Sequence, residues 1–212
     1  MRSILLSIKP KYVADILNGR KTIEIRKQCP KCDLPIDVYI YCTKDNKQHL
    51  YPVLLLDNSN QVSKKEYREA KIDNRSNYLN GKVVAKCDCK NVEEIKLHCL
   101  TKYNSYGLPS VVCEYTTKTL THAKLKEQSC LSSADLEDYF ANALVEKHSI
   151  IGTAIHIENL VIFDKPKELS EFYLLKECKK CKTQCSCFNK GIPCMETLTK
   201  APQSYCFVES EE

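Results

Sequence analysis

The stretch that decides the fold is SILLSIKPKYVADILNGRKTIEIRK (Ser3–Lys27). The apolar run Ile4–Ile8 has the length of a β-strand. Pro10 suits the first turn of a helix, because its missing N–H has no intrahelical partner there, and Gly19 suits the left-handed residue that ends one. From Thr22 onwards apolar and polar residues alternate, which predicts a second strand directly after the helix.

The alternation also predicts which side chains share a face. Ile23 and Ile25 anchor one face in a core, so Glu24 and Arg26 lie together on the other. Two opposite charges on one face can share a hydrogen-bond network or hold one polar ligand between them. Lys21 precedes the strand, so the alternation of the strand does not predict where its side chain points. The alternative interpretation is a solvated charged face, since charged side chains are mostly exposed.

The run GRKTIEIR (Gly19–Arg26) resembles the G-x-K-x-x-E-x-R signature of ASCH domains, which are small β-barrels similar to PUA domains. The resemblance is to the uncharacterised ASCH proteins of bacteria and phages, here with a C-terminal cysteine-rich extension. Further stretches fit that group in the same order along the chain: Val38–Thr43, His156–Ile157 running into Phe163–Pro166, and Ala201–Tyr205.

The resemblance implies a cleft beside the first helix that binds RNA or a modified nucleoside or nucleotide. Arg26 would pair with a phosphate, Lys21 would contact a phosphate or a base carbonyl, and Glu24 would accept from a base amine or orient a neighbouring cation. Closing a barrel brings its first and last strands together, which adds the C-terminal stretch to this site. The expected ligand-binding residues are Lys9, Lys21, Glu24, Arg26, His156, Gln203, Ser204 and Tyr205.

One branch of the ASCH family implies an enzymatic alternative. Its members are small amidohydrolases that remove the acetyl group from N4-acetylcytidine, and their motif lysine, which matches Lys21, is catalytic. Lys21 would be nucleophile or general base and Glu24 a proton shuttle. That branch has threonine where this chain has Glu24, and a carboxylate there stabilises the ammonium form of the lysine. The branch also uses a later glutamate; Glu93 and Glu94 follow a strand, with no direction fixed by the sequence.

A third alternative is a phage or mobile-element protein that docks a partner protein.

The composition fits any of these three functions. The chain has 212 residues, 43% of them hydrophobic and 28% charged, as in ordinary soluble globular proteins. Its net charge of +5 is compatible with a polyanionic partner without requiring one. Only 8% of residues are aromatic and none is Trp, which argues against a broad stacking platform for single strands.

The 14 cysteines are the unusual feature of the composition. Lys9 and Lys11 interrupt the N-terminal apolar run too early for a signal peptide, and no stretch has membrane-spanning length. We therefore expect a cytoplasmic protein without membrane association. In that compartment thiols stay reduced, and clustered cysteines suggest metal before disulfide.

A late segment has the cysteine spacing of a structural zinc site, C-x2-C-x3-C-x-C, because thiolates two to four residues apart can surround one tetrahedral ion. The alternative is a cysteine-rich surface segment without metal. The leading zinc ligands are Cys178, Cys181, Cys185 and Cys187, with Cys194, Cys29 and Cys32 as alternates. The isolated cysteines elsewhere are expected to be small buried hydrophobes.

Together these patterns predict an α+β protein, a small mixed β-barrel of the PUA-like ASCH type with flanking helices and a cysteine-rich insertion before the last strand. The barrel would span residues 1–170 and regain its last strand at 205–208, with the cysteine-rich segment at 171–204. Besides the early helix, Leu136, Phe140 and their neighbours predict a helix capped by Ser132 or Ser133. Residues 100–128 are expected to be mostly loop, with Val111–Cys113 as a candidate short strand. Gly152–Phe163 is expected to be one long strand or two joined by a bend, and Leu169–Leu175 a short helix.

Overall fold

The computed structural model describes residues 2–44, 81–146, 150–175 and 195–210. The chain forms two compact units. The first, unit 1, comprises residues 1–18, 36–88 and 159–212, and the second, unit 2, comprises residues 19–35 and 89–158. Among the described residues, helices are too short or too polar to span a bilayer.

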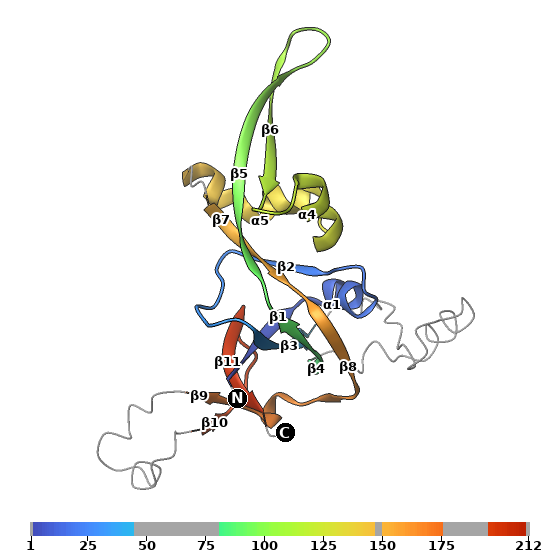
Figure 1. Cartoon of the computed structure of the whole chain (residues 1–212), viewed down its shortest axis with the longest axis vertical. Helices are drawn as coiled ribbons and strands as arrows, with labels where there is room; N and C mark the ends of the chain where they lie inside the picture. Colours follow the sequence, from blue (N-terminus) through green and yellow to red (C-terminus); the bar gives the residue numbers. More distant parts are fainter. Residues whose placement is uncertain (1, 45–80, 147–149, 176–194, 211–212) are drawn as a thin grey trace, which may run out of the picture. The chain divides into compact units, whose positions relative to one another are not determined.

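Unit 1 contains one mixed sheet with the strand order β10-β9-β11-β1-β3-β4-β8, curled as Figure 1 shows. Its first strand runs parallel to β3 and antiparallel to β11. Pairing of the first strand with the last was expected from the sequence, and it extends from Ser3↔Val208 to Leu6↔Tyr205. The elements are β1 (Ser3–Ile8), α1 (Pro10–Leu17), β3 (Ile36–Cys42), β4 (Val83–Cys89), β8 (Glu158–Lys167), η1 (Leu169–Glu171), β9 (Phe172–Leu175), β10 (Met195–Thr197) and β11 (Tyr205–Ser210).

One hydrophobic cluster of unit 1 contains a pair of aromatic rings. The rings of Tyr39 and Phe172 meet edge to face with their centroids 4.8 Å apart, beside the fully buried Leu5 and Val208. The helix predicted after the first strand is α1, and it buries Val13, Ala14, Ile16 and Leu17. Gly19 follows it with a φ of 70°, as a left-handed helix end requires.

Unit 2 contains a four-stranded sheet with the order β2-β7-β5-β6, antiparallel throughout. Ile23 and Ile25 of its edge strand enter a core with Ile95, Tyr115 and Phe140, so the alternation predicted for this strand is confirmed. The elements are β2 (Ile23–Arg26), β5 (Val92–Tyr103), β6 (Pro109–Thr116), α4 (His122–Ser129), α5 (Ser133–Glu146) and β7 (Ile150–His156).

The two helices of unit 2 cover the core. The predicted helix is α5, which contributes Leu136 and Phe140, and the ring of Phe140 stacks on Tyr115 with centroids 5.9 Å apart. The other helix, α4, contributes Leu125, which is fully buried. Both helices thus fix β2 and β7 from the side on which the isoleucines point.

The expectation of a mostly irregular segment at 100–128 was wrong, although the candidate strand at Val111–Cys113 lies within β6. The structure places there the outer part of a long hairpin, β5 and β6, and then α4. In the turn, the Asn104 side chain accepts from the backbone N–H groups of Tyr106 and Leu108 at 3.0 and 2.9 Å. Beyond residue 97 every β5 side chain is exposed, so the alternation of apolar and polar residues that marks a half-buried strand is missing.

Two smaller expectations have different outcomes. The strand proposed after Gly152 is two strands, β7 and β8, with Ile157 between them, which was one of the two forms expected. The helix proposed at Leu169–Leu175 was wrong: one turn, η1, is followed directly by β9. The cysteine-rich segment is described only at its two ends, so its boundaries stay a prediction.

Candidate functional site

The candidate site is a charged trio, Lys21, Glu24 and Arg26, at the edge of unit 2. Lys21 Nζ lies 3.2 Å from Glu24 Oε2, and Arg26 Nε lies 3.0 Å from Glu24 Oε1. The exposed fractions of the three residues are 2%, 7% and 8%. Charges are rarely buried to this extent unless they are paired, and here one carboxylate is shared by two cations.

The lysine of the trio is also held by the end of a helix. Its Nζ donates to the carbonyl oxygen of Ser129, the last residue of α4, at 2.7 Å. The next residue, Thr22, donates its N–H to the carbonyl of Gln128, the residue before Ser129, at 2.9 Å. Carbonyls in the last helical turn have no intrahelical partner and carry negative partial charge, so an ammonium group is stabilised there.

The C-terminus of α4 is shaped for this contact. Cys130 takes a left-handed conformation with a φ of 53°, and its N–H and that of Leu131 turn back to the carbonyls of Glu127 and Lys126. This Schellman-type ending satisfies the earlier carbonyls and leaves those of Gln128 and Ser129 for the β2 segment. Sequence reasoning missed this partner of Lys21, because it missed α4.

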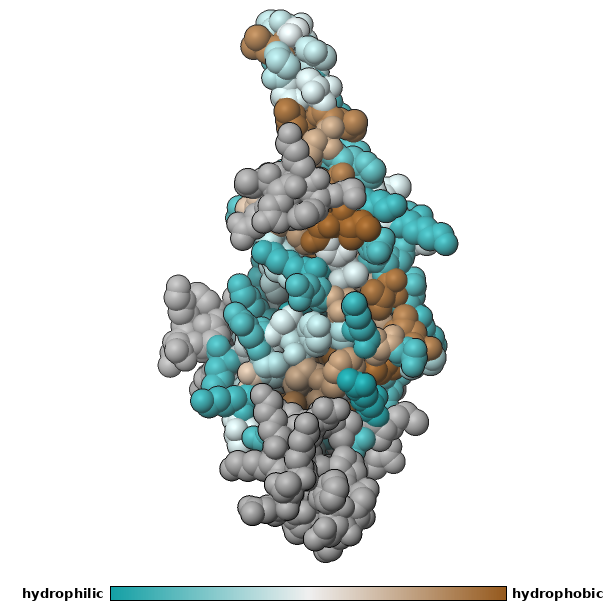
Figure 2. Space-filling view, turned by 90° about the vertical axis from the view of Figure 1, so that its left-hand side faces the viewer, coloured by the Kyte–Doolittle hydropathy of each residue, from teal (hydrophilic) through white to brown (hydrophobic). Residues whose placement is uncertain are grey.

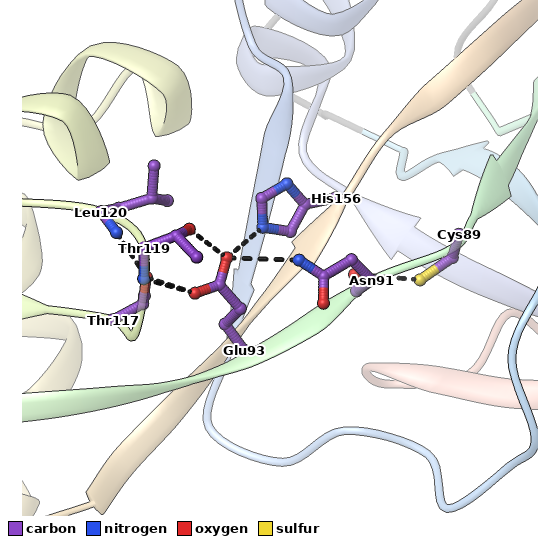
Figure 3. Close-up of polar contacts among 7 residues, drawn as sticks. All are labelled: Cys89, Asn91, Glu93, Thr117, Thr119, Leu120 and His156. Atoms are coloured by element: carbon purple, nitrogen blue, oxygen red, sulfur yellow. Dashed lines mark hydrogen bonds and ion pairs between the residues drawn. The ribbon is translucent and has the colours of Figure 1, made fainter.

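A second polar cluster of unit 2, the Glu93 network, joins Asn91, Glu93, Thr117, Thr119 and His156 (Figure 3). His156 is paired with Ile23, and Glu93 with Ala154, so both share the face of the isoleucines. Glu24 is paired with Ile155 and therefore lies on the opposite face. The structure thus brings Lys21, Glu24 and Arg26 together and places His156 with Glu93 instead.

The carboxylate of Glu93 is held by several donors (Figure 3). Its Oε1 accepts from Thr119 Oγ1 at 2.7 Å and Asn91 Nδ2 at 3.3 Å and lies 2.8 Å from His156 Nε2. Its Oε2 accepts from Thr117 Oγ1 at 2.7 Å and from the Thr119 N–H at 2.9 Å. These bonds tie β5 and β7 to the loop that leads into α4.

The network changes the acidity of Glu93. Burial alone would raise its pKa, but the hydrogen bonds from Thr117, Thr119 and His156 to the ionised carboxylate outweigh burial and lower the pKa to about 2. The group therefore stays ionised at neutral pH. With both oxygens occupied as acceptors, Glu93 serves to position the loop and the imidazole of His156.

The remaining predicted ligand-binding residues belong to unit 1. Lys9 and Gln203 are exposed, and Ser204 and Tyr205 are half-buried. The C-terminal stretch is tied to the end of β1, since Ser7 Oγ donates to the Pro202 carbonyl at 2.7 Å and the Ser7 N–H donates to the Ser204 carbonyl at 3.0 Å. Their expected proximity to the charged trio joins two units and stays a prediction.

The leading zinc ligands lie outside the described residues, as does Cys194. The alternates Cys29 and Cys32 are half-buried in unit 2, and burial, with a smaller contribution from Cys32, raises the pKa of the Cys29 thiol to about 11. Within the described ranges, no three His, Cys, Asp or Glu side chains are grouped as metal ligands. The zinc site therefore stays a prediction.

Comparison with known proteins gives structural similarities only. No protein-family model matches the chain, and no curated protein matches it in sequence. The chain is similar to the crystal structure of ASCH from Zymomonas mobilis, with a TM-score of 0.46 and 14% identity over 98% of this chain and 87% of that one. Two structures of mutants of that protein give TM-scores of 0.45, with 13% and 14% identity over 98% of this chain and 90% and 88% of theirs.

Proposed function

We propose that the chain binds RNA or a modified nucleotide through residues 19–35 of unit 2, with the charged trio at the centre of the site. The observation that carries this proposal is the burial of Lys21, Glu24 and Arg26 around one shared carboxylate. Keeping three charges out of water is costly, and such clusters are concentrated at functional sites. Glu24 orients the two cations, which was one of the roles expected for it.

Exposed cations flank the trio in the sequence of the same segment. Arg20, Lys27 and Lys31 are all exposed, and Asp33 is the only exposed acid between residues 19 and 35. Exposed lysines and arginines contact phosphates and supply affinity without reading sequence. The buried trio supplies fixed hydrogen-bonding groups, of which the Arg26 guanidinium suits a phosphate or a base edge. The exposed cations would therefore supply affinity, and the buried trio would supply selectivity.

The test is the affinity of the full chain for a labelled single-stranded RNA, measured by fluorescence anisotropy over a range of salt concentrations. The double variant Arg20→Ser/Lys27→Ser is compared with Lys96→Ser/Lys118→Ser, which removes two exposed cations elsewhere in unit 2. Phosphate-led binding predicts that affinity falls steeply with salt, and that the first variant lowers the salt slope by about one for each cation removed. The control variant should leave the slope near its original value.

Two results would contradict the proposal. Equal losses in both double variants would mean that net charge matters and the position of the cations does not. No measurable RNA affinity, even at low salt, would remove RNA as the ligand. A protein partner bound with little dependence on salt would favour the third alternative, a protein-interaction module.

A second candidate function is hydrolysis of an N4-acylated cytidine, and the Lys21–Glu24 contact of 3.2 Å favours it, because the enzymatic alternative requires these two groups to meet. Lys21 would attack or deprotonate, and Glu24 would carry the proton. Lys21 donates to Ser129 and lies against Glu24, and substrate would have to replace one of these two contacts. Turnover of N4-acylated cytidines by the wild type and not by Lys21→Ala, with Glu24→Gln impaired, would establish it.

A further inference from the structure

The β5–β6 hairpin of unit 2 brings two cysteines directly opposite each other. The strands pair from Lys96↔Thr116 out to Tyr103↔Pro109, and Cys99 is the partner of Cys113 in that register. Directly opposite residues on antiparallel strands have neighbouring Cβ atoms on one face. Tyr115 lies two residues from Cys113 on the same face of the hairpin, and its side chain is in the core. The two cysteines therefore lie at the boundary between the core and solvent.

The sulfur atoms of this thiol pair, Cys99 and Cys113, are already in contact, with Sγ–Sγ 3.3 Å. A disulfide requires the sulfurs to approach by roughly 1 Å more, which side-chain rotation supplies while the backbone keeps its ladder. We propose that Cys99 and Cys113 are a redox-active pair that closes to a cross-strand disulfide when the protein meets a small-molecule disulfide such as oxidised glutathione.

The two members of the thiol pair differ in access. Cys99 is exposed, and Cys113 is half-buried against the core of unit 2. Burial, the hydrogen bond with Cys99 and the nearby negative charge of Glu137 raise the pKa of Cys113 to about 11. Cys99 is therefore the member that reacts first with an oxidant from solution, and Cys113 is the member that resolves the intermediate.

The reaction balances as a thiol–disulfide exchange. The thiolate of Cys99 attacks one sulfur of oxidised glutathione, the glutathione S–S bond breaks, and one glutathione thiolate leaves. Cys113 then gives its proton to solvent and attacks Cys99 Sγ, which expels the second glutathione. Two protein thiols are oxidised and one glutathione disulfide is reduced to two thiols. Deprotonation of Cys113 limits the second step, so closure is faster at higher pH.

The location of the thiol pair gives closure a structural consequence. Beyond it, the hairpin carries exposed apolar side chains, among them Leu100, Leu108 and Val111, and Figure 2 shows hydrophobic patches along this part of the molecule. Hydrogen bonds of the exposed ladder and the turn hold this outer segment. A disulfide at Cys99 and Cys113 would join the two strands covalently at the base of that segment.

The test uses the full chain and the cleavage sites that the sequence provides. The reduced protein is equilibrated in glutathione buffers of increasing oxidised fraction, remaining thiols are alkylated, and the protein is digested with trypsin. Cleavage after Lys96, Lys102 and Lys118 separates the two cysteines into the peptides Leu97–Lys102 and Tyr103–Lys118. The proposal predicts that these peptides are recovered as one linked species that a reductant separates.

Matched variants make the result specific. Cys99→Ser and Cys113→Ser should each abolish the linked species, whereas Cys206→Ser, which removes a half-buried thiol of unit 1, should leave it unchanged. Thermal melting of each variant verifies that it is folded. Recovery of both peptides in alkylated form while other thiols have oxidised would overturn the proposal. A link from Cys99 to another cysteine in preference to Cys113 would overturn it as well.

Discussion

Lys21 Nζ lies 3.2 Å from Glu24 Oε2, and both side chains are almost fully withdrawn from solvent. The other oxygen of the same carboxylate holds Arg26 at 3.0 Å. Removing the carboxylate charge would leave two buried cations with one fewer counter-charge, a situation that is strongly unfavourable in a low-dielectric environment. Glu24 is therefore expected to be the most sensitive position of the charged trio.

Glu24→Gln should lower the free energy of unfolding by about 3–5 kcal/mol, the usual cost of removing one partner of a buried ion pair. Chemical denaturation monitored by circular dichroism measures this loss. Asp33→Asn is the matched control, because Asp33 is an exposed acid in the same segment and its neutralisation should have little effect. If Glu24→Gln lowered the free energy of unfolding as little as Asp33→Asn does, the ion pairs of Glu24 would contribute little to stability.

The Glu93 network predicts a pH dependence at the acid end. The pKa of Glu93 is lowered from the ordinary value of 4.5 to about 2 in the folded chain. The contribution of Glu93 to the free energy of unfolding is therefore fully present above about pH 4.5 and is lost as the pH falls towards 2. Linkage sets that contribution at roughly 3 kcal/mol at most. Unfolding free energies measured between these pH values should fall more steeply for the wild type than for Glu93→Gln.

The neutral variant supplies the control for that experiment. In Glu93→Gln the amide nitrogen would face a donor, Thr117 or Thr119, so the variant should be less stable at neutral pH and lack this acid slope. Parallel pH curves for the two proteins would mean that other carboxyl groups cause the acid transition and that Glu93 retains an ordinary pKa.

Gly152 has no room for a Cβ atom without movement of its neighbours. A Cβ at this position would lie 2.6 Å from Cε1 of Phe140 and 2.8 Å from the carbonyl oxygen of Arg26, so β7 or α5 would have to move. Gly152→Ala should cost about 1–3 kcal/mol, as overpacking usually does. Thermal denaturation measures the cost. Adding Phe140→Leu should recover part of it, and strictly additive losses would contradict the steric explanation.

The cysteine segment predicts about one zinc ion per chain, bound through thiolates. Metal analysis of reduced, purified protein measures it, with Cys178→Ser/Cys181→Ser expected to lose the metal. Cys29→Ser/Cys32→Ser tests the alternate ligands in the same way. A reduced preparation with no stoichiometric zinc would refute the prediction.

The sequence predicted the elements whose periodicity was clear. Alternation placed Ile23 and Ile25 in the core and put Glu24 and Arg26 on the other face, and the apolar stripe of α5 was equally plain. Pairing of the first strand with the last also followed from the expected closure of the sheet. In each case burial repeats with the period of the element, which is the signal that a sequence carries best.

Sequence analysis missed the elements in which buried residues do not recur at a regular spacing. The helix α4 buries only Leu125 and Ser129, so it lacks an apolar stripe, and Thr121 as its N-cap was the one local signal. The outer hairpin is exposed on both faces, and its turn was marked only by Asn104 and Gly107. The partner of Lys21 is a backbone carbonyl of α4, which no pattern of side chains could indicate.

The most direct measurement is the location of bound RNA on the chain. A single-stranded RNA containing 4-thiouridine would be irradiated in complex with the 212-residue chain, and the cross-linked peptides would be identified by mass spectrometry. We predict cross-links between residues 19 and 35, around the charged trio, which weaken in Arg20→Ser/Lys27→Ser. Cross-links confined to other segments, or unchanged in that variant, would contradict the proposal that this segment is the nucleic-acid site.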